Sequence, residues 1–279
     1  LPLLRESFKM VILNEKRKYM KLLSTGNPKV LKGIKQGYNT YILHLAPAKL
    51  SGHEVCPKRT IGCTDSCLNL AGRGGMFKRG EVTNVIQEAR IRKTKLFFAD
   101  RDAFMALLVK GIQLAIKQSE RLGLIPVFRL NGTSDLSWEK YSVDAFINSS
   151  GKLVFPANIF ERFPEVQFYD YTKVLGRKVQ GISNYHLTFS AADGNDNDVY
   201  AAAKQGYNIA TVLGIKKTVA MPKFYSIATN YGVDMEMPVF NGDESDLRFL
   251  DPKGVIVGLY AKGKAKKDTS GFVKYPTIS

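Results

Sequence analysis

The feature that most constrains the fold is a series of short apolar segments, each of which ends in a cluster of polar residues. Three of them are VFRL before NGTSD (127–135), VQFY before DYTK (166–173) and YHLTFS before AADGNDND (185–198). Helix-like stretches at 155–163 and 198–205 lie between or after these segments. Strands that alternate with helices predict a parallel sheet, and ligands of such sheets bind at the carboxyl ends of the strands.

We therefore expect an α/β fold, with a full or partial β/α barrel as the preferred architecture. TYILHLA (40–46) reads as the first core strand, because it is rich in β-branched and aromatic residues and Pro47 follows it. The pattern predicts an irregular C-terminal portion at 221–251, followed by a strand, VIVGLY (255–260), that closes the sheet. An open doubly wound sheet fits the same pattern. Without a Pro-, Ser- or Gly-rich linker, the chain is expected to form one domain over 1–279.

All three cysteines of the chain lie in one loop, at 51–75, directly after the first predicted strand: Cys56, Cys63 and Cys67. An odd number of cysteines in a chain of this size argues against a disulfide framework. Three thiolates on one short loop can converge on a single metal centre, and a 4Fe-4S cluster held by three cysteines keeps one iron open to a ligand. A structural zinc needs a fourth protein ligand, and His53 is the candidate for a Cys3His zinc site.

The placement of this loop, after the first strand of a barrel-like series, resembles that of radical SAM enzymes. The resemblance implies a 4Fe-4S cluster on Cys56, Cys63 and Cys67, with S-adenosylmethionine as its ligand. Asn131 and Ser134 of NGTSD are then loose counterparts of the glycine-rich motif that binds the amine of S-adenosylmethionine. Arg73, in the run AGRGG, is placed to meet an anionic group of such a ligand.

A second resemblance spans most of the chain. YNTYILHLAPAKLSGHEVCPKRTIGCTDSCLNLAGRG, LFFADRDAF and GLYAKGKAKKDTSGFV are similar to the phage gene product 88 family. This resemblance implies a bacteriophage origin and a cysteine loop typical of the group, and it implies no reaction. Because the odd cysteine count argues against disulfides and no signal peptide is recognised, the expected location is the host cytoplasm.

Polar residues at the predicted strand ends supply the candidate catalytic groups. On a barrel, Asp135, Asp170 and Asp193 share the rim that faces the cysteine loop. Lys173 is a candidate acid or base on the same rim, with Tyr169 or Tyr171 as alternatives.

The net charge of +16, from 41 Lys and Arg against 25 Asp and Glu, favours a polyanionic partner such as a nucleotide or nucleic acid. A basic solvated surface explains the charge equally well. No apolar run reaches the roughly 18 residues of a membrane span, and the N-terminus lacks the pattern of a signal peptide, so no membrane partner is expected.

Two hypotheses follow. The first is a phage iron–sulfur protein, a radical-SAM-like enzyme that acts on a nucleotide or nucleic acid. The second is a non-enzymatic protein that binds nucleic acid or a host protein and has a structural Cys3His zinc site.

Overall fold

The computed structural model describes residues 20–25, 28–70, 72–77, 82–228, 232 and 234–276. These residues form a nine-stranded sheet of order β1-β2-β3-β6-β7-β8-β11-β10-β9 and a separate two-stranded pair, β4-β5. The strands of the large sheet are β1 (Leu23–Ser24), β2 (Tyr38–Leu43), β3 (Ile125–Arg129), β6 (Gln167–Thr172), β7 (Tyr185–Ser190), β8 (Ile209–Leu213), β9 (Phe224–Ala228), β10 (Asp234–Asn241) and β11 (Ile256–Tyr260). The small pair is β4 (Phe146–Ile147) and β5 (Leu153–Val154).

Seven neighbouring strands, β2-β3-β6-β7-β8-β11-β10, pair in parallel. Only β1 and β9, at the two ends of the sheet, are antiparallel to their neighbours. The sheet is therefore mixed but mostly parallel, which confirms the α/β prediction. From β2 to β8 the spatial order follows the chain order, whereas a doubly wound sheet reverses its order near the middle.

The helices are short except for two long ones that follow the cysteine loop. They are α2 (Pro28–Ile34), α3 (Ile61–Asp65), α4 (Val85–Ala99), α5 (Arg101–Arg121), α6 (Ile159–Arg162) and α7 (Asp196–Lys204). Single 3-10 turns are η1 (Leu68–Leu70), η2 (Gly72–Gly75), η3 (Trp138–Lys140), η4 (Arg248–Leu250) and η5 (Gly263–Lys267). Asp100 caps α5, because its carboxylate accepts the N–H of Ala103 at 3.1 Å.

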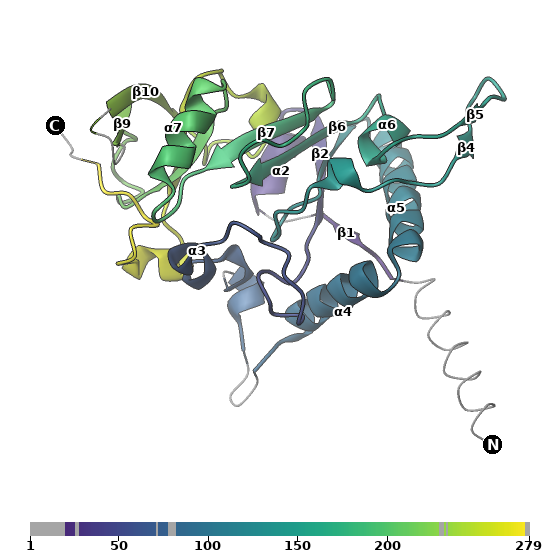
Figure 1. Ribbon diagram of the computed structural model, residues 1–279, viewed down its shortest axis with the longest axis horizontal. Helices are drawn as coiled ribbons and strands as arrows, with labels where there is room; N and C mark the ends of the chain where they lie inside the picture. The colour runs from purple at the N-terminus through teal and green to yellow at the C-terminus, as the bar shows by residue number, and fades with distance from the viewer. Residues whose placement is uncertain are drawn as a thin grey trace.

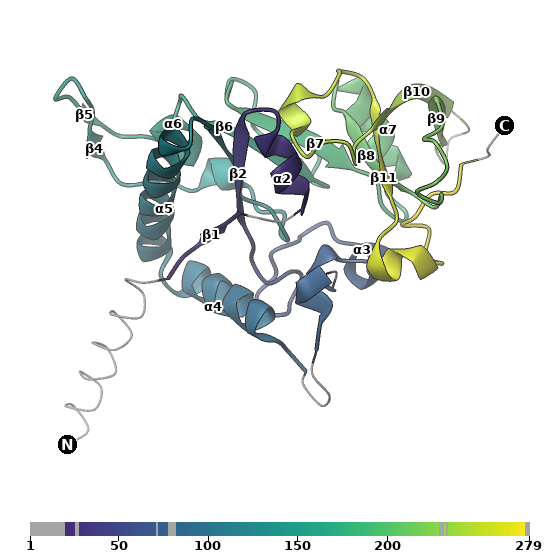
Figure 2. The ribbon, with the colours of Figure 1, turned by 180° about the vertical axis from the view of Figure 1, so that it is seen from behind.

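The connections from β2 to β8 pack on one face of the sheet. Tyr41 and Phe128 of that face share a core cluster with Phe104 of α5 and Phe160 of α6, and further along the sheet Val199 of α7 packs in the same way. The opposite face is covered by α2 and by the segment around η4. Figures 1 and 2, seen from opposite sides, show α7 in front of the sheet in one view and α2 in front of it in the other.

Sequential parallel strands with their crossovers on one face have the winding of a β/α barrel. The structure shows the sheet itself, and its closure into a full or partial barrel stays a prediction.

The C-terminal portion differs from the prediction in two respects. Residues 221–251, expected to be irregular, contain β9 and β10, which pair as an antiparallel hairpin with Met235 opposite Ile227. VIVGLY was expected to close the sheet, but β11 lies between β8 and β10 and is an interior strand. The hairpin is partly exposed and includes Pro238, so its residues lack the continuous apolar run that marks the central strands.

Among the described residues, no helix combines the length and the apolar character that crossing a membrane requires. The prediction of one domain stays a prediction.

Candidate functional site

The three cysteines lie in the segment that leaves the carboxyl end of β2. Cys56 follows the fully buried Val55 and packs against the main core cluster. Cys63 lies within α3, and Cys67 comes two residues after that helix ends. All three are free thiols and all are half-buried. The sulfur atoms therefore come from three separate points of the loop, at the edge of the sheet where parallel strands end.

Asp193, at the end of β7, holds the cysteine-bearing helix in place. Thr60 caps α3 by accepting the N–H of Cys63 at 3.1 Å, and its own hydroxyl donates to Asp193. The N–H of Gly62 donates to the other carboxylate oxygen at 3.1 Å. A β-carbon at Gly62 would lie only 2.7 Å from Cβ of Phe272, so this close approach requires glycine. Asp193, expected as a rim carboxylate, thus anchors the loop.

The thiols are close enough to affect one another's ionisation. The pKa of Cys56 is raised to about 12, mainly by burial and in part by the charges of Cys67, Asp135 and Cys63, while a hydrogen bond from the N–H of Ala48 at 3.5 Å acts to lower it. Burial also raises the pKa of Cys67, and the charge of Cys63 adds to this effect. The buried thiols therefore keep their protons at neutral pH unless a cation replaces them.

Lys173, directly after β6, lies beside these thiols. Burial alone would lower the pKa of this lysine, but Cys63, Asp135 and Cys56 outweigh burial and raise it. Its ammonium group lies within the electrostatic influence of Cys63, while its backbone N–H donates to Asp135 at 2.7 Å. The structure therefore brings Lys173 and Asp135, both predicted from sequence, to the cysteines.

A buried ion-pair network of Arg177 and Glu139 lies beside Asp135. Arg177 donates to both carboxylate oxygens of Glu139, at 2.7 and 2.6 Å, and lies 3.7 Å from Asp135. Burial raises the pKa of Asp135, which the N–H and charge of Lys173 partly offset. The network fixes the loop after β3 against the loop after β6.

Asp170 is fully buried within β6 and binds the end of the neighbouring strand. Its carboxylate accepts the N–H of Asn131 at 2.8 Å, the N–H of Leu130 at 3.3 Å and the hydroxyl of Tyr185 at 3.2 Å. Burial raises the pKa of Asp170 to about 7, although the positive charge of Arg129 acts to lower it. These contacts link the carboxyl end of β3 to β6.

Asn131 and Ser134, the residues expected to bind a cofactor, bind each other. The side-chain oxygen of Asn131 accepts the hydroxyl of Ser134 at 2.9 Å, the N–H of Leu136 at 3.0 Å and the indole N–H of Trp138 at 3.0 Å. Asn131 thus organises the turn after β3. Arg73 lies in η2, and its side chain is outside the described part of the chain.

His53, the expected fourth zinc ligand, is exposed, and its ring stacks on Phe98 with 4.3 Å between the ring centroids. Within the part of the chain that the structure describes, no three His, Cys, Asp or Glu side chains are placed to hold a metal ion. The thiols are close enough to affect one another's ionisation, but the structure does not arrange them as a metal-ligand set.

Sequence reasoning missed three charged residues near the thiols. Arg177 and Glu139 form the ion pair described above, and Arg90 of α4 hydrogen-bonds Asn69 and lowers the pKa of Cys67 by its charge. The density of basic residues at 73–95, just beyond the cysteines, is a sequence signal that could have indicated Arg90. No local pattern pointed to Arg177 or Glu139.

The alkylation rate of Cys56 is expected to rise about tenfold per pH unit between pH 8 and pH 10, because only the thiolate reacts and burial raises this pKa to about 12. Peptide-level mass spectrometry after timed iodoacetamide treatment measures the rate. In guanidinium the same cysteine should show the ordinary profile, which levels off above about pH 8.5. A native profile that levels off there would contradict the burial of Cys56.

The fold and the site define a mostly parallel α/β protein with a three-cysteine loop at the carboxyl edge of its sheet. The model of the family described as Gene product 88 matches residues 19–276, so the chain belongs to this phage family. No curated protein and no solved structure matches the chain.

Proposed function

We propose that the cysteine loop binds a 4Fe-4S cluster through Cys56, Cys63 and Cys67 and that the protein is an iron–sulfur enzyme. The observation that carries the proposal is the proximity of three thiols at the carboxyl edge of a parallel sheet, where the charges of Cys67 and Cys63 both raise the pKa of Cys56. This edge is where α/β enzymes bind their ligands.

The donor set suits soft metals. Thiolates bind iron–sulfur clusters and zinc, whereas the oxygen-rich sites of Mg²⁺ and Ca²⁺ use carboxylates and carbonyls. Binding replaces the thiol protons, and the positive charge of the metal removes the penalty that burial places on the thiolates of Cys56 and Cys67. Lys173 and Arg90, the cations beside the thiols, stabilise the negative charge of the thiolate ligands.

The winding of the sheet supports a partial barrel, and the loop follows its first parallel strand, β2, as in radical SAM enzymes. S-adenosylmethionine as the ligand of the cluster stays a prediction. The side chains of Asn131 and Ser134 already bind each other, so this contact would have to break for either side chain to bind such a ligand.

Anaerobic purification followed by iron, sulfide and zinc analysis tests the proposal. We expect about four irons and four sulfides per chain and a broad absorbance near 400 nm. Each of the variants Cys56→Ser, Cys63→Ser and Cys67→Ser should lower the iron content at least about tenfold, since the loss of a ligand exceeds the effect of losing an outer-shell contact.

Lys58→Ser is the matched control, because Lys58 is exposed in the same loop and is not a thiol. It should leave iron content and absorbance unchanged. One zinc per chain with no iron would overturn the cluster and support the zinc alternative. Protein that binds neither metal would overturn both.

A further inference from the structure

A cavity rich in lysine opens at the carboxyl ends of β8 and β11. It has a volume of about 600 Å³, which is within the range of small-molecule sites. Four lysines line it, together with two tyrosines: Lys216, Lys217, Lys262, Lys266, Tyr260 and Tyr275. Its position follows from the parallel pairing of β8 with β11, because both strands end at the same edge of the sheet.

The cavity has an excess of positive charge. Lys216, Lys217 and Lys266 are exposed, and none of them forms an ion pair with another described residue. Only Lys262 has an acidic partner, Asp243. Unpaired ammonium groups that share one concave surface raise the local positive potential and attract phosphates.

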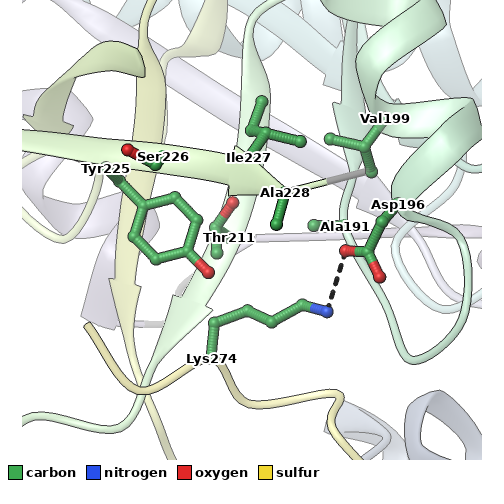
Figure 3. Close-up of a pocket in the computed structure, with 9 residues that line it drawn as sticks. All are labelled: Ala191, Asp196, Val199, Thr211, Tyr225, Ser226, Ile227, Ala228 and Lys274. Atoms are coloured by element: carbon green, nitrogen blue, oxygen red, sulfur yellow. Dashed lines mark hydrogen bonds and ion pairs between the residues drawn. The ribbon is translucent and has the colours of Figure 1, made fainter. Parts of the chain in front are cut away.

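A smaller cavity of about 190 Å³ between α7 and β9 offers a contrast. There the single cation, Lys274, is bound to Asp196 at 3.0 Å, as Figure 3 shows. Its charge is compensated within the protein, so this cavity has no comparable attraction for an anion.

An aromatic ring is held at the edge of the lysine cavity. The C-terminal segment runs alongside β8, where Lys274 N–H donates to Val212 at 2.8 Å and Gly214 N–H donates to Lys274 at 2.9 Å. This pairing places the ring of Tyr275 directly on Gly214, where a β-carbon would lie 2.2 Å from the ring. Tyr275 is nonetheless 64% exposed. One side of the ring is therefore against the backbone, and much of the rest is open to a ligand.

We propose that this cavity binds a nucleotide unit, with its phosphates on Lys216, Lys217 and Lys266 and its base stacked on Tyr275. Clustered cations beside an exposed aromatic ring are the combination that recognises nucleotides and single-stranded nucleic acids. The shared chemistry is a phosphate next to a base, and the nucleotide is either free or part of a single strand.

The cavity adjoins the cysteine loop. η1, just after Cys67, contacts η5, which carries Lys266, and the C-terminal segment around Phe272 packs against Gly62 of α3. Both views of the ribbon show η5 beside α3 (Figures 1 and 2). A bound nucleotide thus lies on the same edge of the sheet as the thiols. Nucleotide binding here does not depend on a metal.

Binding of fluorescent 12-nucleotide single strands, of ATP and of inorganic phosphate to the full chain tests the proposal. The triple variant of Lys216, Lys217 and Lys266 to alanine should weaken nucleotide binding at least about tenfold and reduce the salt slope by about three. Tyr275→Ala should weaken binding about 5- to 150-fold, while Tyr275→Phe keeps the affinity.

The matched control replaces three exposed lysines elsewhere, Lys117, Lys152 and Lys178, with alanine. It changes the net charge equally and should alter binding less than about threefold. Circular dichroism checks that each variant folds. An equal loss in both triple variants would overturn the proposal, as would ATP and oligonucleotide binding that is unchanged in Tyr275→Ala.

If ATP binds with the same affinity as the oligonucleotide, the ligand of the cavity is a free nucleotide. If the oligonucleotide binds and ATP does not, the ligand is a single strand. Either result supports the cavity as a nucleotide site. The same titration on the Cys63→Ser variant should give the wild-type affinity, so failure of the metal proposal remains distinguishable from failure of this one.

Discussion

Replacing Arg177 with methionine is expected to lower the free energy of unfolding by about 3–5 kcal/mol. The side chains of Arg177 and Glu139 are 1% and 3% exposed, and two hydrogen bonds of 2.7 and 2.6 Å join them. Removing the guanidinium leaves the carboxylate of Glu139 buried without a partner, and Asp135 loses a cation 3.7 Å away. Equilibrium unfolding in urea, followed by circular dichroism, measures the change.

Arg59→Met provides the comparison. Arg59 pairs with Glu54 at 2.9 Å, but the two side chains are 33% and 31% exposed, so the expected loss is below about 1 kcal/mol. The double variant Arg177→Met with Glu139→Gln should recover part of the loss, because no uncompensated charge remains at Glu139. Equal losses for Arg177→Met and Arg59→Met would contradict the burial of the network.

This network also shows the limit of sequence reasoning about the site. Cys56, Cys63 and Cys67 were identified from their proximity in the sequence, and Lys173 and Asp135 from their position after predicted strands. Parallel strands bring such positions together, so a local pattern was sufficient. Arg177 and Glu139 lie 38 residues apart in loops, and charged loop residues ordinarily face solvent. Their burial depends on pairing across the fold, which no local pattern records.

The same distinction explains the fold. β2, β3, β6 and β7 are buried in the sheet, so apolar runs predict them. β9 and β10 form the partly exposed end of the sheet, where Glu236 and Pro238 interrupt any apolar run. Their order in the sheet depends on contacts with β11. A prediction from apolar runs therefore found the centre of the sheet and missed this end.

Replacing Trp138, the only tryptophan, with alanine is expected to lower the free energy of unfolding by about 3–5 kcal/mol. From sequence it could stack a nucleic-acid base or pack against the sheet. The structure buries it completely, with ring centroids 5.5 Å from Phe97 and 5.9 Å from Tyr141, and its indole N–H donates to Asn131. Trp138→Ala therefore leaves a large cavity and an amide oxygen with one donor fewer.

Trp138→Phe separates these two effects. It keeps an aromatic ring in the cluster and removes the hydrogen bond to Asn131, so we expect a smaller loss than for alanine, about 1–3 kcal/mol. Urea unfolding measures both variants, and nucleotide affinity is measured on the folded fraction. Because Tyr275 and not Trp138 is proposed to stack the base, Trp138→Phe should leave nucleotide affinity unchanged. A large loss of affinity with full stability would instead place the base at Trp138 and contradict its burial.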